Sequence, residues 1–136
     1  MCYKRISLLA PALVVLGLTA HPAAADEFTK EELQKWRQQF RTVVEKGEKL
    51  FHSSELGSNG HNCAGCHPDA ANTHPETYPK LQKQLGQVAE LRNMINWCIE
   101  NPLEGKPLPL DSEELMQLEA YINWERRGVA LDPGKH

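Results

Sequence analysis

The sequence predicts a small all-α domain in which about three main helices are joined by long loops. Apolar residues recur with helical spacing in three stretches, and each stretch is bounded by residues that start or stop helices. No stretch shows the alternation of apolar and polar residues that is typical of a strand. The length of 136 residues fits a single domain. We expect helices over about 29–51, 87–100 and 111–127.

The first helix is expected to begin at a capping box, because Thr29 is followed three residues later by Glu32. Gly47 lies inside the helical pattern, where glycine costs about 1 kcal/mol relative to alanine. We therefore expect Gly47 to allow close packing against another element. The apolar positions of this helix are Leu33, Trp36, Phe40, Val43, Val44, Leu50 and Phe51.

The second and third helices are bounded by similar signals. Pro102 restricts the backbone of Asn101 and so ends the second helix. Asp111 and Glu114 form a second capping box, and Gly128 is a suitable C-terminal cap. The expected buried positions of the third helix are Leu115, Leu118, Tyr121, Ile122 and Trp124.

The N-terminal stretch has the pattern of a secretory signal peptide. A short basic region precedes an apolar run over 6–18, and small residues up to Ala25 provide a cleavage site. The apolar run is too short to span a membrane. We expect residues 1–25 to be removed and the domain over 26–136 to lie in the periplasm without a membrane span.

The charge balance argues against one class of partner. The chain has 15 Lys and Arg against 18 Asp and Glu, which gives a net charge of −3. Binding to nucleic acid or to anionic lipid requires a basic patch, which this sequence does not contain. We therefore expect no nucleic acid as a partner, and a mildly negative surface favours docking to a basic protein.

The expected loop over 53–80 contains the motif that carries chemistry, "CAGCH" at residues 63–67. A loop of this length is unusual in a compact domain unless it is functional. The order C-x-x-C-H is the attachment signature of c-type haem. Cys63 and Cys66 would each form a thioether with one vinyl group of the porphyrin, and His67 would bind the iron. We therefore expect one covalently bound haem c at the centre of a cytochrome c-like domain.

Three other interpretations explain the motif less well. A thioredoxin-like redox pair requires a βαβ context, which the helical pattern does not supply. A zinc site requires a second ligand pair, and His61, His74 and Cys98 lack the matching spacing. A plain disulfide within the motif leaves its histidine without a role.

A second axial ligand of the iron must come from elsewhere in the chain. Met94 and Cys98 are four residues apart on the expected second helix, so they share one face. An unpaired thiol in an exported protein is prone to oxidation unless it is buried or ligated, which favours a role for Cys98. Thiolate ligation would lower the reduction potential and methionine ligation would raise it. Both residues are candidates, beside the less favoured His52, His61, His74 and Met116.

The segment "LRNMINWCIENPLEGKPLPLDSEELMQLEAYINWERRGV", residues 91–129, resembles the corresponding part of thiosulfate dehydrogenases. It resembles more weakly the haem-bearing A subunit of the Sox sulfur-oxidation complex. The family pattern is roughly R-I-N-x-C, then G-K-x-L-P-x-D-S-x-E-M, then A-Y-I-x-W, and it matches residues 94–98, 105–116 and 120–124. The resemblance implies a cytochrome c fold, a link to sulfur-compound oxidation, and Cys98 as an axial haem ligand.

Two departures from the family pattern bear on activity. Met94 occupies the position of the family's arginine, which helps to hold the anionic sulfur substrate, so an anion clamp is missing. Thiosulfate dehydrogenases typically carry two haems, whereas this sequence has one attachment motif. A single haem passes one electron at a time, whereas coupling two thiosulfates requires two. Both departures argue against independent thiosulfate oxidation. The departure at position 94 also keeps Met94 open as a ligand.

We therefore expect an electron carrier that passes single electrons between redox partners and binds them transiently, and that is not itself an enzyme. Two alternatives stay open. The first is a haem subunit or relative of a sulfur-oxidising enzyme, with Cys98 close to the chemistry. The second is a gas-binding cytochrome whose distal ligand dissociates. The aromatic residues expected to pack against the haem or in the core are Tyr78, Trp97, Tyr121 and Trp124.

Overall fold

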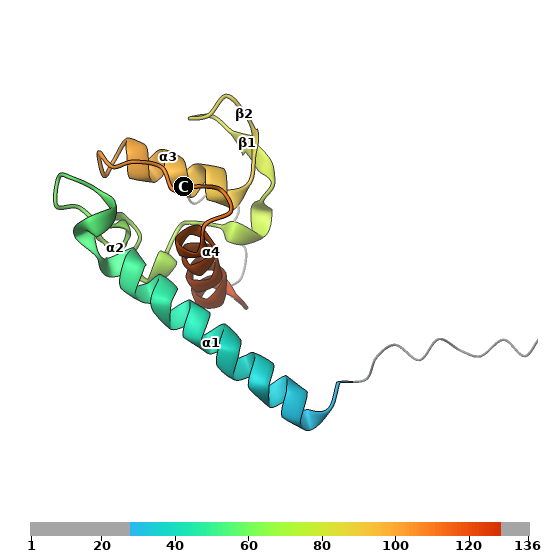
Figure 1. The fold of residues 1–136 in the computed structure, drawn as a ribbon. Helices are drawn as coiled ribbons and strands as arrows, with labels where there is room; N and C mark the ends of the chain where they lie inside the picture. Colours follow the sequence, from blue (N-terminus) through green and yellow to red (C-terminus); the bar gives the residue numbers. More distant parts are fainter. Residues whose placement is uncertain (1–27, 129–136) are drawn as a thin grey trace, which may run out of the picture.

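Three long helices dominate residues 28–128, the part of the chain that the computed structural model describes (Figure 1). They are α1 (Lys30–His52), α3 (Leu91–Glu100) and α4 (Glu113–Arg126). The expectation of an all-α domain with about three main helices is therefore confirmed. The expected signal peptide, residues 1–25, lies outside the described residues.

Short elements occupy the long connection between α1 and α3. They are the 3-10 helix η1 (Ser54–Leu56), the one-turn helix α2 (Cys63–Cys66), the 3-10 helices η2 (Pro68–Ala70) and η3 (Pro75–Thr77), and the strands β1 (Lys80–Gln82) and β2 (Gln87–Ala89). The two strands form an antiparallel pair, in which Lys80 lies opposite Ala89 and Gln82 lies opposite Gln87. The segment expected to be a loop is thus largely a chain of single turns.

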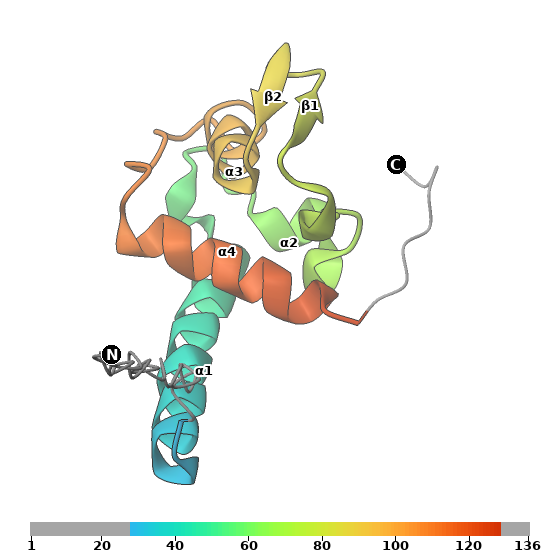
Figure 2. The same ribbon diagram turned by 90° about the vertical axis from the view of Figure 1, so that its right-hand side faces the viewer.

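The core forms where α4 crosses the C-terminal half of α1 (Figure 2). The rings of Phe51 on α1 and Tyr121 on α4 pack with their centroids 5.0 Å apart. A Cβ atom on Gly47 would lie 1.9 Å from the carbonyl oxygen of Gln117, so the two backbones touch at this point. The close packing expected at Gly47 is confirmed. Buried side chains of this core include Val44, Phe51, Leu115, Leu118, Tyr121 and Ile122.

The N-terminal half of α1 extends beyond the body of the domain (Figure 1). Leu33, Trp36 and Phe40 continue the apolar spacing along this half, yet all three are exposed. Phe40 still approaches α4, because its ring centroid lies 5.9 Å from that of Trp124. Apolar spacing therefore predicted the helix correctly, although its buried residues, Val44, Gly47 and Phe51, all lie in its C-terminal half.

Two expected boundaries are wrong. Residues 87–89, expected in the second helix, form strand β2, and α3 begins only at Leu91. Gly86 at a φ of +67° allows the chain to turn back onto β1, a conformation that glycine adopts without strain. The cap of α4 is Ser112 rather than Asp111, because the Ser112 hydroxyl accepts a hydrogen bond from the Leu115 N–H at 3.2 Å.

Side-chain contacts hold α3 against α4 and the connector between them. The Arg92 guanidinium donates two hydrogen bonds to the Glu119 carboxylate, at 3.2 and 2.7 Å. Asn96 donates to the Leu108 carbonyl at 2.8 Å and accepts from the Leu108 N–H at 2.9 Å. Asn96 is only 8% exposed, and these two hydrogen bonds pair both the nitrogen and the oxygen of its side-chain amide. Among the described helices, none is long and apolar enough to cross a membrane.

Replacing Gly47 with alanine tests the contact between α1 and α4. We expect Gly47→Ala to lower the free energy of unfolding by about 1–3 kcal/mol, the usual cost of overpacking. Helix propensity alone would change it by about 1 kcal/mol in the opposite direction. Chemical denaturation followed by circular dichroism measures the difference. Lys46→Ala, at an exposed neighbouring position, is the control. A Gly47→Ala protein as stable as the control would contradict the contact.

Candidate haem-binding site

The C-x-x-C-H motif forms a single helical turn that begins at Cys63. The His67 N–H donates to the Cys63 carbonyl at 2.9 Å, so positions 63, 66 and 67 lie on one face of the turn. Asn62 caps this turn, because its side-chain oxygen accepts from the Gly65 N–H at 2.9 Å. The Asn62 amide also donates to the His52 carbonyl at 3.1 Å, which ties the motif to the end of α1.

A hydrogen bond fixes the imidazole of His67. Its Nδ1 atom lies 2.8 Å from the Ala71 carbonyl oxygen, and because a carbonyl only accepts, Nδ1 carries the hydrogen. The Nε2 atom is then left with its lone pair free, which is the state in which histidine binds a metal.

The loop after His67 follows an unusual backbone path. Among the described residues, four of the five non-glycine residues with positive φ fall within 69–74: Asp69, Ala70, Asn72 and His74. Such conformations cost about 1–3 kcal/mol each and persist only where the surroundings impose them. Ala70 is fully buried against the core, and the path brings the Ala71 carbonyl back to the histidine.

The motif opens into a cavity of about 430 Å³, within the range of small-molecule and cofactor sites. Cys63, Cys66 and His67 form one part of its wall. Apolar side chains form much of the rest, including Phe51 from α1 and Leu118 and Ile122 from α4. None of the side chains that line the cavity within residues 28–128 is acidic.

Helix α3 turns one face to this cavity. Leu91, Met94, Ile95 and Cys98 follow the i, i+3, i+4, i+7 spacing and all line it. The shared face expected for Met94 and Cys98 is therefore present. Burial raises the pKa of the Cys98 thiol to about 11, and the charge of nearby Cys66 adds to this effect. Burial likewise raises the pKa of Cys63 to about 11, with Cys98 as the next cause. Three thiols and the Met94 thioether thus line one cavity, in which burial disfavours the thiolate forms of Cys63 and Cys98.

The remaining ligand candidates divide into two groups. His52, His61 and Met116 do not line the cavity. The Nδ1 atom of His52 instead lies 2.9 Å from the Glu48 carbonyl oxygen. His74 does line it, and its Nδ1 atom lies 3.3 Å from a Glu76 carboxylate oxygen. The Nε2 atom of His74 is buried and has no hydrogen-bond partner within residues 28–128.

These features fit a porphyrin better than the other interpretations of the motif. Cys63, Cys66 and Cys98 are all free, so the motif holds no disulfide. Within the described part of the chain, no three His, Cys, Asp or Glu side chains form a group that could hold a metal ion by themselves. A porphyrin supplies four nitrogen ligands of its own and requires apolar walls. The buried, unpartnered nitrogen of His74 is a further sign that a polar group belongs in the cavity.

Two contributors to the site were not expected from the sequence. Asn62 precedes the motif with Gly65 three residues later, which is a capping signal that could have been found. Lys80 lines the cavity from β1, and no sequence signal marks it because the strand itself was not expected. Trp97 and Tyr78 line the cavity, whereas Tyr121 lies in the core and Trp124 is half-buried beside it.

Comparison with known proteins shows the family to which this domain belongs. The family model described as SoxA/TsdA, cytochrome c domain, matches residues 46–131. A thiosulfate dehydrogenase of Psychrobacter arcticus is 31% identical over 99 residues, which cover 63% of this chain and 30% of that protein. The L-cysteine S-thiosulfotransferase subunit SoxA of Pseudaminobacter salicylatoxidans is 27% identical over 111 residues, covering 74% of this chain and 36% of that protein. This chain spans about a third of the length of these relatives.

The fold is also found in a solved structure. The crystal structure of SoxXA from P. pantotrophus contains a chain that superposes with a TM-score of 0.59 at 17% identity. The match covers 77% of this chain and 44% of that one. The expected cytochrome c-like fold is thereby confirmed. The chain therefore belongs to the family of SoxA/TsdA cytochrome c domains, a class of domain that carries covalently bound haem c.

Proposed function

We propose that this protein is a periplasmic cytochrome that holds one haem c and passes single electrons between redox proteins. The observation that carries the proposal is the single cavity that both motif thiols, the motif imidazole and two sulfur side chains of α3 line together. When bound, the haem supplies an iron that accepts and releases one electron. Cys63 and Cys66 would attach its edge, and His67 would bind the iron through Nε2.

Cys98 is the leading candidate for the second axial position. It lies close enough to Cys66 for the two thiols to influence one another, and it faces the same cavity as His67. In the family pattern, the matching cysteine binds haem iron. Met94 shares its helix face one turn earlier and is the alternative. A protein that fills both axial positions holds its iron closed to small ligands, which suits electron transfer.

The surroundings of Met94 support a carrier rather than an independent oxidase. Arginine at this position would offer a bidentate donor to an anionic substrate, and methionine does not. The nearest arginine on the helix, Arg92, does not compensate. Its guanidinium donates hydrogen bonds to the Glu119 carboxylate and to the Leu110 carbonyl. Arg92 also does not line the cavity. A redox partner would instead approach the haem and bind transiently.

A second candidate function follows from the relatives. Those named above are a thiosulfate dehydrogenase and a SoxA subunit, and both names refer to sulfur chemistry. On this alternative, the domain is the haem-bearing part of a sulfur-oxidising enzyme, and Cys98 lies next to the reaction. Both candidate functions require export of the chain and cleavage after Ala25, because haem c is attached to the chain after export.

The first expected outcome concerns the covalent bond. Protein exported together with the haem-attachment machinery should be heavier than its bare processed chain by one haem, as measured by intact mass spectrometry under denaturing conditions. Cys63→Ala should retain one thioether through Cys66 and give a lower yield of folded protein. A colourless parent protein with the mass of the bare chain would overturn the proposal.

The second expected outcome assigns the distal ligand. Cys98→Ala should convert the ferric protein from low spin to a form with an open sixth position, as seen by absorption and electron paramagnetic resonance. Met94→Ala should leave the parent spectrum unchanged. If the two variants behave the other way round, Met94 is the ligand. If neither changes the spectrum, the unpartnered nitrogen of His74 becomes the candidate.

The third expected outcome separates carrier from enzyme. The reduced protein should show no spectral change with carbon monoxide, because both axial positions are filled. It should also show no thiosulfate-dependent reduction of an artificial electron acceptor above that of a protein-free control. Rapid binding of carbon monoxide would favour a gas-binding cytochrome. Thiosulfate-dependent turnover that Cys98→Ala abolishes would favour the sulfur-oxidising alternative.

A further inference from the structure

The wall that β1 contributes to the cavity has an unbalanced positive charge. Lys80 lines the cavity, none of the lining side chains is acidic, and Lys80 has no ion pair within residues 28–128. The Lys80 ammonium lies 4.5 Å from the centre of the Tyr78 ring, which it contacts as a cation. Glu90, which directly follows β2, has its carboxylate 3.5 Å from Arg92 instead. A partly buried cation that has no ion pair within residues 28–128 is a suitable contact for an anionic group of a ligand in this cavity.

Tyr78 adds a neutral donor at the same wall. Its oxygen accepts a hydrogen bond from the Gln82 amide, so its own hydrogen is free to point elsewhere. Burial raises the pKa of Tyr78, so the phenol keeps this hydrogen near neutral pH. Gln82 and Gln84 line the same part of the cavity. Four side chains able to donate hydrogen bonds therefore gather over residues 78–84.

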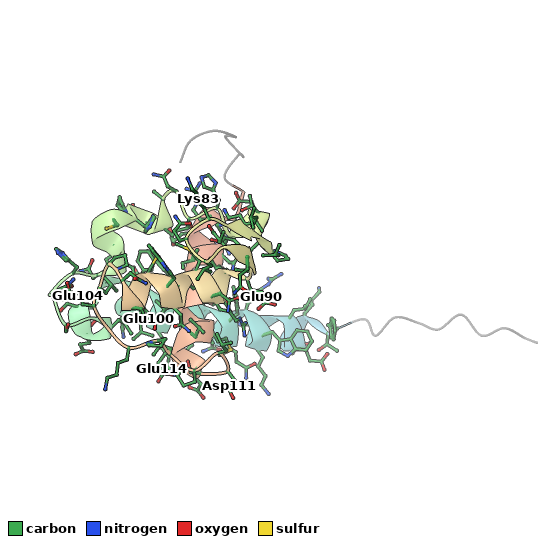
Figure 3. All side chains as sticks on the ribbon, turned by 90° about the horizontal axis from the view of Figure 1, so that it is seen from above. Lys83, Glu90, Glu100, Glu104, Asp111 and Glu114 are labelled. Atoms are coloured by element: carbon green, nitrogen blue, oxygen red, sulfur yellow. The ribbon has the colours of Figure 1, made fainter. Side chains whose placement is uncertain are left out.

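This wall lies away from the motif cysteines. Strand β2 leads directly into the start of α3, so β1 lies near that end. The chain before α2 is bound to the other end of α3, because the Ser58 N–H donates to the Leu103 carbonyl at 3.0 Å. In Figure 3, Glu90 and Glu100 mark these two ends of α3. The vinyl and carboxylate substituents of haem also lie on different edges of the ring, so attachment at α2 directs the carboxylates away from it.

We propose that residues 78–84 form the carboxylate-binding edge of the cavity, where the Lys80 ammonium and the Tyr78 hydroxyl hold the propionate groups of the haem. The inference rests on the proposed haem in this cavity and adds the side chains that orient and balance it. The contacts neutralise negative charge close to the iron. Lys80 thereby favours the reduced state, which carries one positive charge fewer at the iron.

The test compares reduction potentials of haem-loaded variants at fixed ionic strength. Lys80→Met should lower the midpoint potential, and Lys80→Arg, which keeps the charge, should restore it toward the parent value. Lys83→Met removes the same charge from the exposed connection between β1 and β2, where Figure 3 places Lys83 away from α3, and should shift the potential less. Tyr78→Phe should give a smaller fall, and it reports on the same edge if Lys80→Met fails to load haem.

Each outcome separates this inference from the proposed function. A parent protein without haem would defeat the proposed function itself. Haem-loaded Lys80→Met with the same potential as Lys83→Met would overturn the inference and leave the proposed function standing. Replacing chloride with sulfate at constant ionic strength tests a free oxyanion at this edge. A sulfate-dependent potential in the parent that disappears in Lys80→Met would assign the edge to a free anion and overturn the propionate contact.

Discussion

The site depends on one side chain, the amide of Asn62. Its oxygen caps the helical turn that carries the motif, and its nitrogen donates to the last carbonyl of α1. A single residue therefore sets both the conformation of the motif and its position relative to α1. Each hydrogen bond contributes about 0.5–1.5 kcal/mol net, but the two together also fix an orientation. Since α1 packs on α4 across Gly47, the hydrogen bond to His52 fixes the motif relative to the core.

Helix α3, which forms another wall of the cavity, is held in place by contacts that do not involve Asn62. Arg92 holds α3 to α4, and Asn96 holds it to the connector at Leu108. Both contacts involve residues of α3 that do not line the cavity, so they hold the helix independently of Met94 and Cys98. Met94 could therefore differ from the arginine of the family pattern without loss of these two contacts.

Periodicity and capping rules predicted the three long helices, because burial against a neighbour and local hydrogen bonds act over a few residues. They failed at residues 87–89, where pairing with β1 overrides the helical spacing. At the start of α1 the expected capping box of Thr29 and Glu32 is present, but the apolar positions that follow it are exposed. The motif drew attention to Cys63, Cys66 and His67 from sequence alone, and the structure places all three in the wall of one cavity. Lys80 could not be found this way, because its role arises only when the strand brings it to a cavity lined by distant elements.

The charges around the cavity also bear on the choice between its two sulfur donors. Burial opposes a bare thiolate at position 98, since the neighbouring thiol of Cys66 adds to the cost and Lys80 is the one lysine or arginine in the described lining. Ferric iron offsets a thiolate ligand at the centre of the ring, so the charges still uncompensated would be those of the carboxylates at its edge. A methionine ligand would leave the centre positive and reduce the need for a cation nearby. Lys80, in a cavity whose described lining has no acidic side chain, would then balance those carboxylates, which is the arrangement expected if Cys98 rather than Met94 is the ligand.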